Sequence, residues 1–399
     1  MVINSVIKNV QAENLYKHVL ETEGIRHPLE TLEKLEETAQ YLLTLFENIG
    51  LVTREHFFEV EGFNYSFRNI EGLLDFDKEQ ELIICAHYDT IAECLGANDN
   101  SSALAVMLEA ARLLAKQEQH DYNIRFIGFC LEEENPSRVL KEQELGKKFG
   151  ILDENNRFAT LRAQKIMEEH FDLRAEVFSD DKTLSESWDI ATKQLRPKLS
   201  DQELQYFLAL QEIYGQDTAI SWIGNSITLG SYAYVQALPQ DKQQISGVFN
   251  LESVGYASNQ YNSQTFPDWV DLSMFPSNKL NSDLLIGNFI GVFSDSNSYH
   301  IAKLFCDQCN LEVIDLPHLL WHYPSSFDKI AYEMPDMLRS DHAPFWKINV
   351  PAIMICDTLD FRYPYYHTKA DTIDKLNFDF MTKVCQATIA SVMAFSKID

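Results

Sequence analysis

Five short segments of this chain each place a metal-binding or proton-transferring side chain just after an apolar run or just before a helical one. The side chains are His87 and Asp89, then Asp99, then Glu132 and Glu133, then Glu252, and finally His367. Imidazole and carboxylate groups without thiolate suit zinc best, with manganese or cobalt as alternatives. Two histidines and three carboxylates can hold two divalent ions if one carboxylate bridges them. A further carboxylate then remains to act as a base, so the set predicts metal-assisted hydrolysis.

The elements that must position these side chains follow from the hydrophobic pattern. Apolar spacing of three and four residues predicts a helix over residues 29–49. Short apolar runs predict buried strands over 82–86, 124–131, 248–251 and 351–356, with further strands over 54–60 and 66–74. Helices are expected over 101–117, 298–309 and 378–395. Strands that alternate with helices predict an α/β protein: a mixed, mostly parallel central sheet covered by helices on both faces, in an α/β/α sandwich.

The candidate residues occupy one kind of position in this scheme. All of them except Asp99 follow the C-terminal end of a predicted strand, and Asp99 comes just before the helix over 101–117. The C-terminal ends of parallel strands share one edge of the sheet, where ligands bind. The sequence therefore predicts that distant segments converge on a single site.

Composition narrows the classes of partner. The chain has 399 residues, 45% of them hydrophobic, and a net charge of −27, which repels phosphate backbones and anionic lipid. A nucleic-acid or membrane partner is therefore not expected. We find neither an apolar run of membrane-spanning length nor an N-terminal signal peptide, and the seven cysteines have no regular spacing, so cytoplasmic localisation is expected. Cys306 and Cys309 lie in a helical pattern, which predicts core packing rather than metal binding.

Seven stretches together resemble the zinc-dependent aminopeptidases of family M28, the exopeptidases with two co-catalytic metal ions. The stretches are Ala86-His87-Tyr88-Asp89-Thr90, Gly96 to Ala103, Phe126 to Glu133, Leu229-Gly230-Ser231-Tyr232, Phe249-Asn250-Leu251-Glu252, Ser340 to Phe345, and Tyr366 to Thr372. Their order and spacing make the match specific. The resemblance implies an enzyme that removes N-terminal residues from peptides with a free amino terminus.

The resemblance also implies a role for each candidate residue. One ion would be held by His87, Asp99 and Glu252, and the other by Asp99, Glu133 and His367, with Asp99 as the bridge. Glu132 would be the general base and acid, and Asp89 would orient His87 through its ring N–H. The family more often has aspartate at position 252, so the glutamate here is a departure. Asp341 and His342 are expected to line the crevice, and Asp371 to support the site or cap a helix. Phe361, Tyr363, Tyr365 and Tyr366 could form a wall of the side-chain pocket, but most of them are expected to pack in the core.

A second departure concerns the domain organisation. The chain is expected to be a single M28-like peptidase domain over 1–399, interrupted at about 136–228 by a polar, mainly helical insertion. Ser200 and Glu203 predict a capping box at the start of one of its helices. The insertion follows the acidic run directly, so it could form a lid or wall that limits substrate size. A dimerisation surface or a neutral decoration is an equal alternative, and a homo-oligomer stays open.

Three other functions compete with the aminopeptidase. A glutaminyl-peptide cyclotransferase shares this fold and several of the motifs, but uses one zinc. A carboxypeptidase or other amidase on a related scaffold would carry a separate dimerisation domain, and a non-catalytic binding protein would be expected to have lost ligands. The complete set of predicted ligands favours the two-metal peptide hydrolase.

Overall fold

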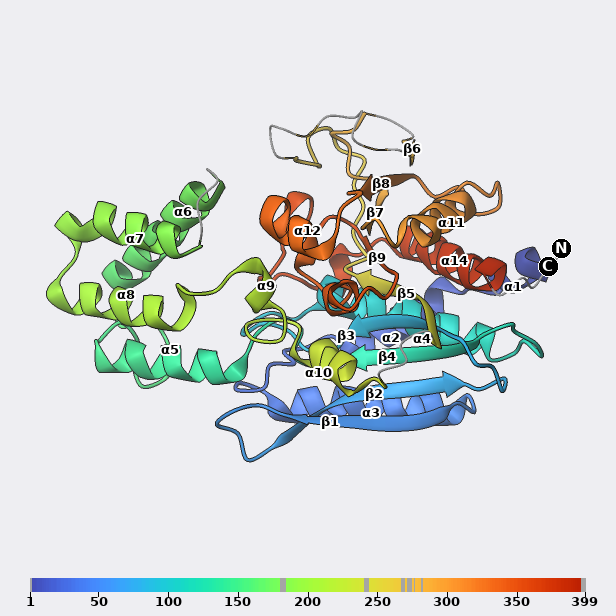
Figure 1. Cartoon of the computed structure of the whole chain (residues 1–399), viewed down its shortest axis with the longest axis horizontal. Coiled ribbons are helices and arrows are strands. Elements are labelled where there is room, and N and C mark those ends of the chain that lie inside the picture. Colours follow the sequence, from blue (N-terminus) through green and yellow to red (C-terminus); the bar gives the residue numbers. More distant parts are fainter. Residues whose placement is uncertain are drawn as a thin grey trace.

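The computed structural model describes residues 2–179, 184–239, 244–266, 270, 275, 277–280 and 283–395. Within these residues a nine-stranded sheet forms the centre of the molecule (Figure 1). The strands are β1 (Val52–Glu59), β2 (Ser66–Leu74), β3 (Glu81–His87), β4 (Asn123–Phe129), β5 (Ile245–Glu252), β6 (Ser277–Lys279), β7 (Ile290–Ser294), β8 (His318–His322) and β9 (Ala352–Cys356). Their order across the sheet is β1-β2-β4-β3-β5-β9-β7-β8-β6.

The middle of the sheet is parallel and its flanks are mixed. β3 pairs in parallel with both β4 and β5, and β5 pairs in parallel with β9. β1 and β2 extend one flank in antiparallel fashion, and β7 runs antiparallel to β9 on the other. The C-terminal ends of β4, β3, β5 and β9 therefore lie side by side at one edge, as the sequence predicts.

Helices cover both faces of this sheet. The helices are α1 (Val2–Ile7), α2 (Ala12–Thr22), α3 (Leu32–Asn48), α4 (Ala103–Leu114), α5 (Pro136–Lys148), α6 (Leu161–Ser179), α7 (Leu184–Leu195), α8 (Asp201–Tyr214), α9 (Ala219–Trp222), α10 (Leu229–Ala237), α11 (Tyr299–Cys309), α12 (Phe327–Glu333), α13 (Ala343–Lys347) and α14 (Phe378–Phe395). α3, α4 and α11 contact one face, with α2 and α14 packed outside them, and α10 and α13 contact the other. This arrangement confirms the predicted α/β/α sandwich. No helix in the described part of the chain has the length and apolarity to cross a membrane.

The two layers follow from the side chains of β3. Leu82 and Ile84 join the core under α3 and α4, whereas Ile83 and Cys85 join the core under α10 and α13. Successive side chains of a strand point to opposite faces, so a strand covered on both sides is apolar at every position. That is why this run lacks the alternation of a half-exposed strand.

Two parts of the fold differ from the pattern-based expectation. The helix expected over 101–117 begins only at Ala103, because residues 97–102 form an irregular turn, η1, in which Asp99 and Asn100 have non-helical backbone angles. The short strands β6, β7 and β8 were not predicted. β6 has only three residues, β7 contains a glycine and β8 has a histidine at each end, so their apolar runs are short or interrupted.

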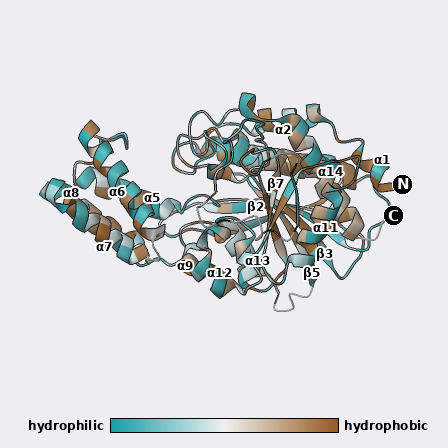
Figure 2. Cartoon of the chain, turned by 90° about the horizontal axis from the view of Figure 1, so that it is seen from above, coloured by the Kyte–Doolittle hydropathy of each residue, from teal (hydrophilic) through white to brown (hydrophobic). Residues whose placement is uncertain are grey.

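The helices α5 to α8 form a unit that projects from the sheet domain (Figures 1 and 2). They enclose an apolar cluster of their own, which includes Ile166, Trp188 and Phe207. The capping box expected at Ser200 and Glu203 opens α8. We call residues 136–214 the helical module; residues 180–183, within the proposed insertion, lie outside the described residues.

The helical module joins the sheet domain next to the acidic run. The amide of Thr228 donates to the carbonyl of Glu132 at 2.7 Å, so the returning chain lies against the departing one. Arg138, in the first turn of α5, forms an ion pair with Asp217 and donates to Ser226 Oγ at 2.6 Å. These contacts tie both ends of the module to the edge where the parallel strands end.

Candidate metal centre

Asp99 lies between two histidines that come from opposite ends of the sequence. Its Oδ1 atom is 3.2 Å from His87 Nε2, and its Oδ2 atom is 3.3 Å from His367 Nε2. His87 ends β3, whereas His367 follows β9 after a loop. The two oxygens of one carboxylate thus face two different imidazoles, which is the geometry of a bridging ligand.

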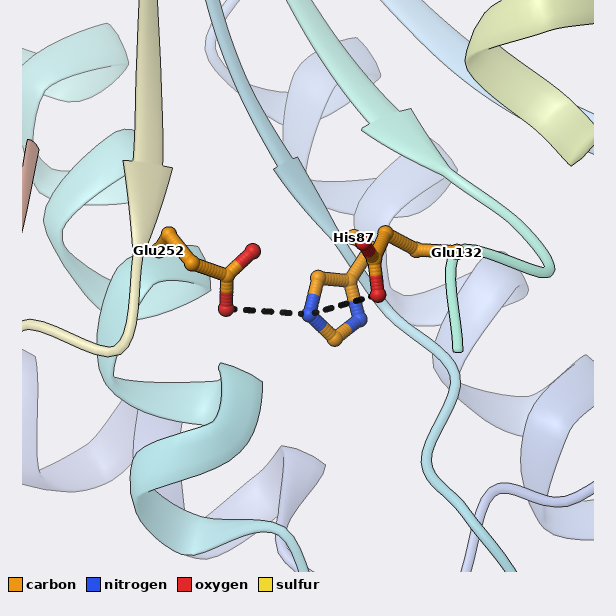
Figure 3. Close-up of side chains that lie close together, drawn as sticks. All are labelled: His87, Glu132 and Glu252. Atoms are coloured by element: carbon orange, nitrogen blue, oxygen red, sulfur yellow. Dashed lines mark hydrogen bonds and ion pairs between the residues drawn. The ribbon is translucent and has the colours of Figure 1, made fainter. Parts of the chain in front are cut away.

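Three glutamates complete the cluster around these histidines. Glu252 Oε1 is 3.3 Å and Glu132 Oε2 is 3.9 Å from His87 Nε2, from opposite sides (Figure 3). Glu133 Oε2 is 3.0 Å from His367 Nε2. Donor atoms of His87, Glu132 and Glu252 lie within 4.8 Å of one another, and so do those of His87, Asp99 and Glu133. The structure therefore brings together all six of the residues to which a metal-binding or catalytic role was assigned.

Most of this cluster is shielded from water. The side chains of His87 and Asp99 are 1% and 3% exposed, and those of Glu132 and Glu133 are both 7% exposed. His367 is 30% exposed, so its side marks where solvent reaches the cluster. Charges in such a low-dielectric site interact much more strongly than they would in water.

The pKa values of the carboxyl groups show that this site holds too much negative charge. Burial and the nearby Asp99 raise the pKa of Glu133 to about 7, although His367 opposes the rise. Burial also raises the pKa of Glu132 well above its usual range, and Glu252 and Asp341 add to the rise against His87. Ionisation of two neighbouring carboxyl groups in a buried site is unfavourable, because the two negative charges repel each other.

The pKa values of His87 and His367 are raised as well, whereas that of Asp99 is lowered. Burial lowers the pKa of His367, but Glu133 and Asp99 outweigh it and bring the pKa to about 10. Burial raises the pKa of Asp99, but the nearby imidazoles of His367 and His87 outweigh it and hold the pKa below its usual range. Without another cation, both imidazoles therefore carry the positive charge that this carboxylate needs.

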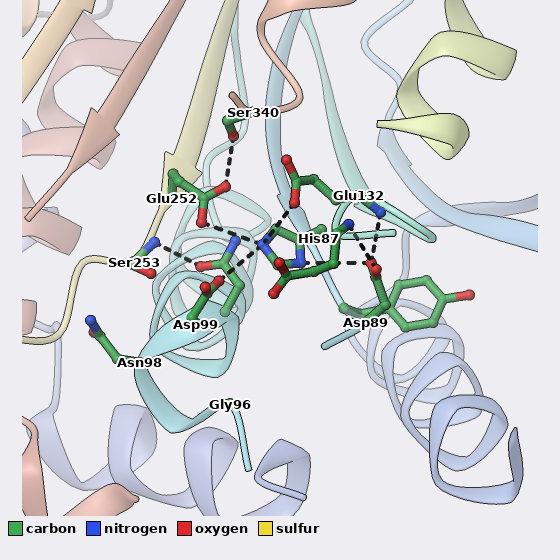
Figure 4. Close-up of polar contacts among 12 residues, drawn as sticks. His87, Asp89, Gly96, Asn98, Asp99, Glu132, Glu252, Ser253 and Ser340 are labelled. Carbon is green, nitrogen blue, oxygen red and sulfur yellow. Dashed lines mark hydrogen bonds and ion pairs between the residues drawn. The ribbon is translucent and has the colours of Figure 1, made fainter. Parts of the chain in front are cut away.

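Asp89 faces the expected ring nitrogen of His87 as an ion pair, and it also makes contacts that were not expected. Its Oδ1 atom is 3.6 Å from His87 Nδ1, which is longer than a hydrogen bond. Its two oxygens instead accept from the backbone amides of Glu132 and Glu133, at 3.0 and 3.1 Å (Figure 4). Asp89 therefore fixes the backbone of the acidic run, a role that its spacing from His87 did not indicate.

Asp371 supports the bridging carboxylate from the other side. It accepts from the amides of Asn98 and Asp99 at 2.8 and 3.1 Å and from the hydroxyl of Tyr363 at 2.7 Å. Asp99 provides no side-chain cap for the helix after it. The irregular turn that carries Asp99 is thus held by Asp371, a residue close to the C-terminal helix.

Glu252 has a support that sequence reasoning missed. Ser340 Oγ donates to Glu252 Oε2 at 2.6 Å, and Asn250 Nδ2 donates to the same Ser340 oxygen at 2.7 Å. Asn250 precedes Glu252 by two residues on β5, so both side chains point to one face of the strand. That spacing was a usable signal for a polar pair, but the involvement of Ser340 requires the tertiary fold.

The remaining residues singled out in the sequence have separate roles. Asp341 is buried close to Ser231 and His87, and burial raises its pKa to about 7. His342 instead packs edge-on against Trp346 and contacts the carbonyl of Met337 at 2.7 Å, so it is a core residue. The expected crevice-lining position thus fits Asp341 but not His342.

The four aromatic residues near His367 differ in their burial and contacts. The ring of Tyr366 stacks on His367 with centroids 3.7 Å apart, and its hydroxyl accepts from Arg339 at 3.4 Å. Tyr363 is buried, as expected of a core residue. Phe361, Tyr365 and Tyr366 are only partly buried, so the expectation that most of the four pack in the core is wrong.

Bound divalent metal ions would account for this arrangement better than hydrogen bonds alone. His87 Nε2 faces Asp99, Glu252 and Glu132 at once, but a single N–H can serve only one of them well. The buried atoms Asp99 Oδ1 and His367 Nε2 have no hydrogen-bond partner. A cation between these atoms would be bound by several nitrogen and oxygen atoms at once and would offset the excess negative charge.

Comparison with known proteins identifies the family. The model of peptidase family M28 matches residues 69–169 and 314–393, which include all the cluster residues except Glu252. The chain belongs to peptidase family M28. The interval between the two matched ranges contains most of the helical module and β5.

Two curated relatives share parts of this M28 chain. The uncharacterized protein YfbL of Escherichia coli is 27% identical over 164 residues, which cover 40% of this chain and 44% of that protein. Aminopeptidase YwaD of Bacillus subtilis is 52% identical over 50 residues, which cover 12% of this chain and 11% of that protein. The chain thus aligns with less than half of either relative.

Solved structures share the fold of this M28 chain along most of its length. The LapA aminopeptidase of Legionella pneumophila is 16% identical with a TM-score of 0.57, covering 99% of this chain and 74% of that one. A glutaminyl cyclase of Porphyromonas gingivalis is 15% identical with a TM-score of 0.56, covering 97% of this chain and 99% of that one. At these identities the likeness concerns the fold alone.

The raised pKa values predict how stability depends on pH in the absence of metal. The pKa values of Glu133 and Asp341 are raised to about 7 and that of His367 to about 10, so the folded state binds more protons than the unfolded state. Their stabilising contribution is present at low pH and is lost as the pH rises through these values. Between about pH 5.5 and pH 8.5 in chelator, these groups should therefore lower the unfolding temperature, whereas His18, His120, His170 and His342, which are buried with lowered pKa values, act in the opposite direction.

Added zinc should reverse this trend, because metal ions favour the ionised carboxylates and neutral imidazoles. The rise in unfolding temperature on adding zinc should be larger at the higher pH. The variant Asp341→Asn removes one of the shifted groups and should show a smaller pH dependence in chelator. An identical change in unfolding temperature between the two pH values in the metal-free wild type and in Asp341→Asn would contradict the electrostatic description.

Proposed function

We propose that this M28 protein is a metal-dependent aminopeptidase that uses two divalent ions, most favourably zinc. The observation that carries the proposal is the division of the two Asp99 oxygens between His87 and His367. His87, Asp99 and Glu252 would hold one ion, and Asp99, Glu133 and His367 would hold the other. When bound, such ions polarise the scissile carbonyl and make water acidic enough to ionise near neutral pH.

The remaining carboxylate supports the proton transfers. Glu132 lies beside His87 but is 3.9 Å from its Nε2 atom, farther than Asp99 or Glu252. Its backbone amide is fixed by Asp89, so the side chain projects into the cluster from the end of β4. In the proposed mechanism Glu132 accepts a proton from the attacking water and delivers it to the departing peptide nitrogen.

The excess negative charge of the cluster supports the proposal that the substrate has a free, positively charged amino terminus. Six buried or nearly buried carboxyl groups gather here: Asp89, Asp99, Glu132, Glu133, Glu252 and Asp341. When all six are ionised in the metal-loaded site, their negative charge exceeds the positive charge that two divalent ions would bring. The residual field favours an ammonium group next to the scissile bond, whereas it would repel the C-terminal carboxylate that a carboxypeptidase binds.

The exchange Glu132→Gln should lower kcat by roughly 100-fold or more, since general acid–base groups contribute about that much. Metal content, measured by elemental analysis, should stay at the wild-type level. The matched control is Glu134→Gln, which removes a half-exposed carboxylate two positions along the same run. Wild-type turnover in Glu132→Gln would exclude Glu132 as the base.

The cyclotransferase remains the second candidate, because the bacterial glutaminyl cyclase shares the fold over nearly the full length of both chains. The metal-loaded protein should release the amine from aminoacyl-nitroanilides and should not cyclise an N-terminal glutaminyl peptide. Mass spectrometry distinguishes the products, because hydrolysis adds water and cyclisation expels ammonia. Cyclisation with one equivalent of metal would transfer the assignment to the cyclotransferase.

We also propose that the helical module limits the length of substrates. The module leaves the sheet domain two residues after Glu134 and projects from the edge where the ligands converge (Figure 1). Its separate apolar cluster and the ion pair between Arg138 and Asp217 allow its removal with little change to the sheet domain.

Replacement of residues 139–216 by a short glycine-serine linker should leave cleavage of aminoacyl-nitroanilides nearly unchanged. Cleavage of long peptides should increase relative to dipeptides, as measured by kcat/KM for a length series. If the wild type and the shortened variant had the same preference for peptide length, the helical module would not limit substrate size. A monomeric product from an oligomeric parent, seen by size-exclusion chromatography, would indicate a dimerisation surface instead.

A further inference from the structure

The connection between α2 and α3 packs against several of the segments that carry the metal-site residues. Residues 22–27, which we call the N-terminal strap, lie outside both ranges matched by the family model. Arg26 and His27 in this strap are fully buried. A buried guanidinium needs several acceptors to replace its lost hydration, so its partners identify what it holds in place.

Arg26 first fixes the segment that follows β3. Its Nε atom donates to the carbonyl of Tyr88 at 2.7 Å. Tyr88 stands between His87 and Asp89, so this bond fixes the backbone from which both side chains project. The backbone of Arg26 adds to the contact, because its amide donates to Thr90 Oγ1 at 2.9 Å.

The same guanidinium reaches the segment that leads to Asp99. Nη2 donates to the carbonyl of Gly96 at 3.1 Å, and Nη1 donates to that of Leu95 at 3.3 Å. Gly96 has a φ of +62°, and a Cβ atom there would lie 2.6 Å from Arg26 Nη2. Only glycine allows this approach, which leaves the Gly96 backbone directly against the charged group.

Other strap residues contact two further segments of the site. His27 Nε2 is 3.2 Å from Glu134 Oε2, next to the acidic run. Glu23 Oε1 accepts from the amide of Ile373 at 3.1 Å, in the segment that follows His367. The strap thus joins four ligand-bearing segments, and Glu252 is held separately by Ser340.

We propose that Arg26 is a positioning residue of the metal centre, which sets the separation of His87 from Asp99 by binding the carbonyls of Tyr88 and Gly96 with one rigid fork. The inference rests on the proposed metal-dependent function. The contacts and the charge of Arg26 should affect zinc affinity in opposite directions. The contacts position the ligands, whereas the guanidinium also lies near Asp89, Asp99 and Asp371 and its charge repels cations. Lysine separates the two effects, since it keeps the charge but lacks the planar fork.

The experiment measures zinc affinity of the full-length protein by competition with a chromophoric chelator. Arg26→Lys should weaken zinc binding by roughly tenfold or more, the effect typical of groups that orient metal ligands. The matched control is Arg125→Lys near the start of β4, where Arg125 pairs with Glu71 and Glu81. This control should lower the unfolding temperature but leave zinc affinity unchanged.

Thr90→Val is the milder second variant, because it removes only the bond from the Arg26 amide. It should weaken zinc binding in the same direction by a smaller factor, and it decides the question if Arg26→Lys does not fold. Wild-type zinc affinity in whichever variant folds would show that Arg26 only stabilises the fold, and tighter binding would show that its contacts hold the ligands away from the best metal geometry; either result overturns the inference. A wild-type protein that binds no zinc would overturn the proposed function as well, so the two failures are distinct.

Discussion

Asp99 shares its carboxylate between His87 and His367, and this sharing constrains which segments of the fold must meet at the site. The two histidines are separated by 280 positions in the sequence, yet both ring nitrogens lie within 3.3 Å of one side chain. Such an approach requires that the ends of β3 and β9 lie at the same edge of the sheet. The parallel pairing of β3 with β5 and of β5 with β9 meets that requirement.

Burial of so many acids has to be stabilised by the surrounding backbone. Carboxylates in a low-dielectric site repel each other unless cations or hydrogen-bond donors compensate. Here the backbone amides of the acidic run bind Asp89, and those next to the bridging residue bind Asp371. These acids therefore act as acceptors that hold the backbone, and they leave the central carboxylates free for cations.

The helical module is stabilised separately from the sheet domain. Its cohesion comes from a separate apolar cluster and from stacked groups, such as the Arg174 guanidinium 4.0 Å from the ring of Trp188. It is attached to the sheet domain through Arg138 and Asp217 and through the backbone hydrogen bond from Thr228 to Glu132. This attachment is the reason that we propose a role for the module in substrate selection rather than in the chemistry.

Local sequence was sufficient for much of the fold. Continuous apolar runs such as 82–86 mark buried strands, because a strand covered on both faces needs apolar side chains at each position. Ser200 and Glu203 marked a helix start, because a capping box involves only neighbouring residues. The short strands β6 to β8 gave no such pattern, since pairing with neighbours rather than local preference defines them.

The sequence by itself determined which chemical groups this protein possesses and, through the ends of its buried strands, that His87, Glu132 and Glu252 would converge. Only the tertiary structure decided which atoms they face. The division of the Asp99 oxygens, the bond from Ser340 to Glu252 and the partners of Arg26 all join residues far apart in the chain. No local pattern encodes such contacts, because they depend on how separate elements pack once the sheet has formed.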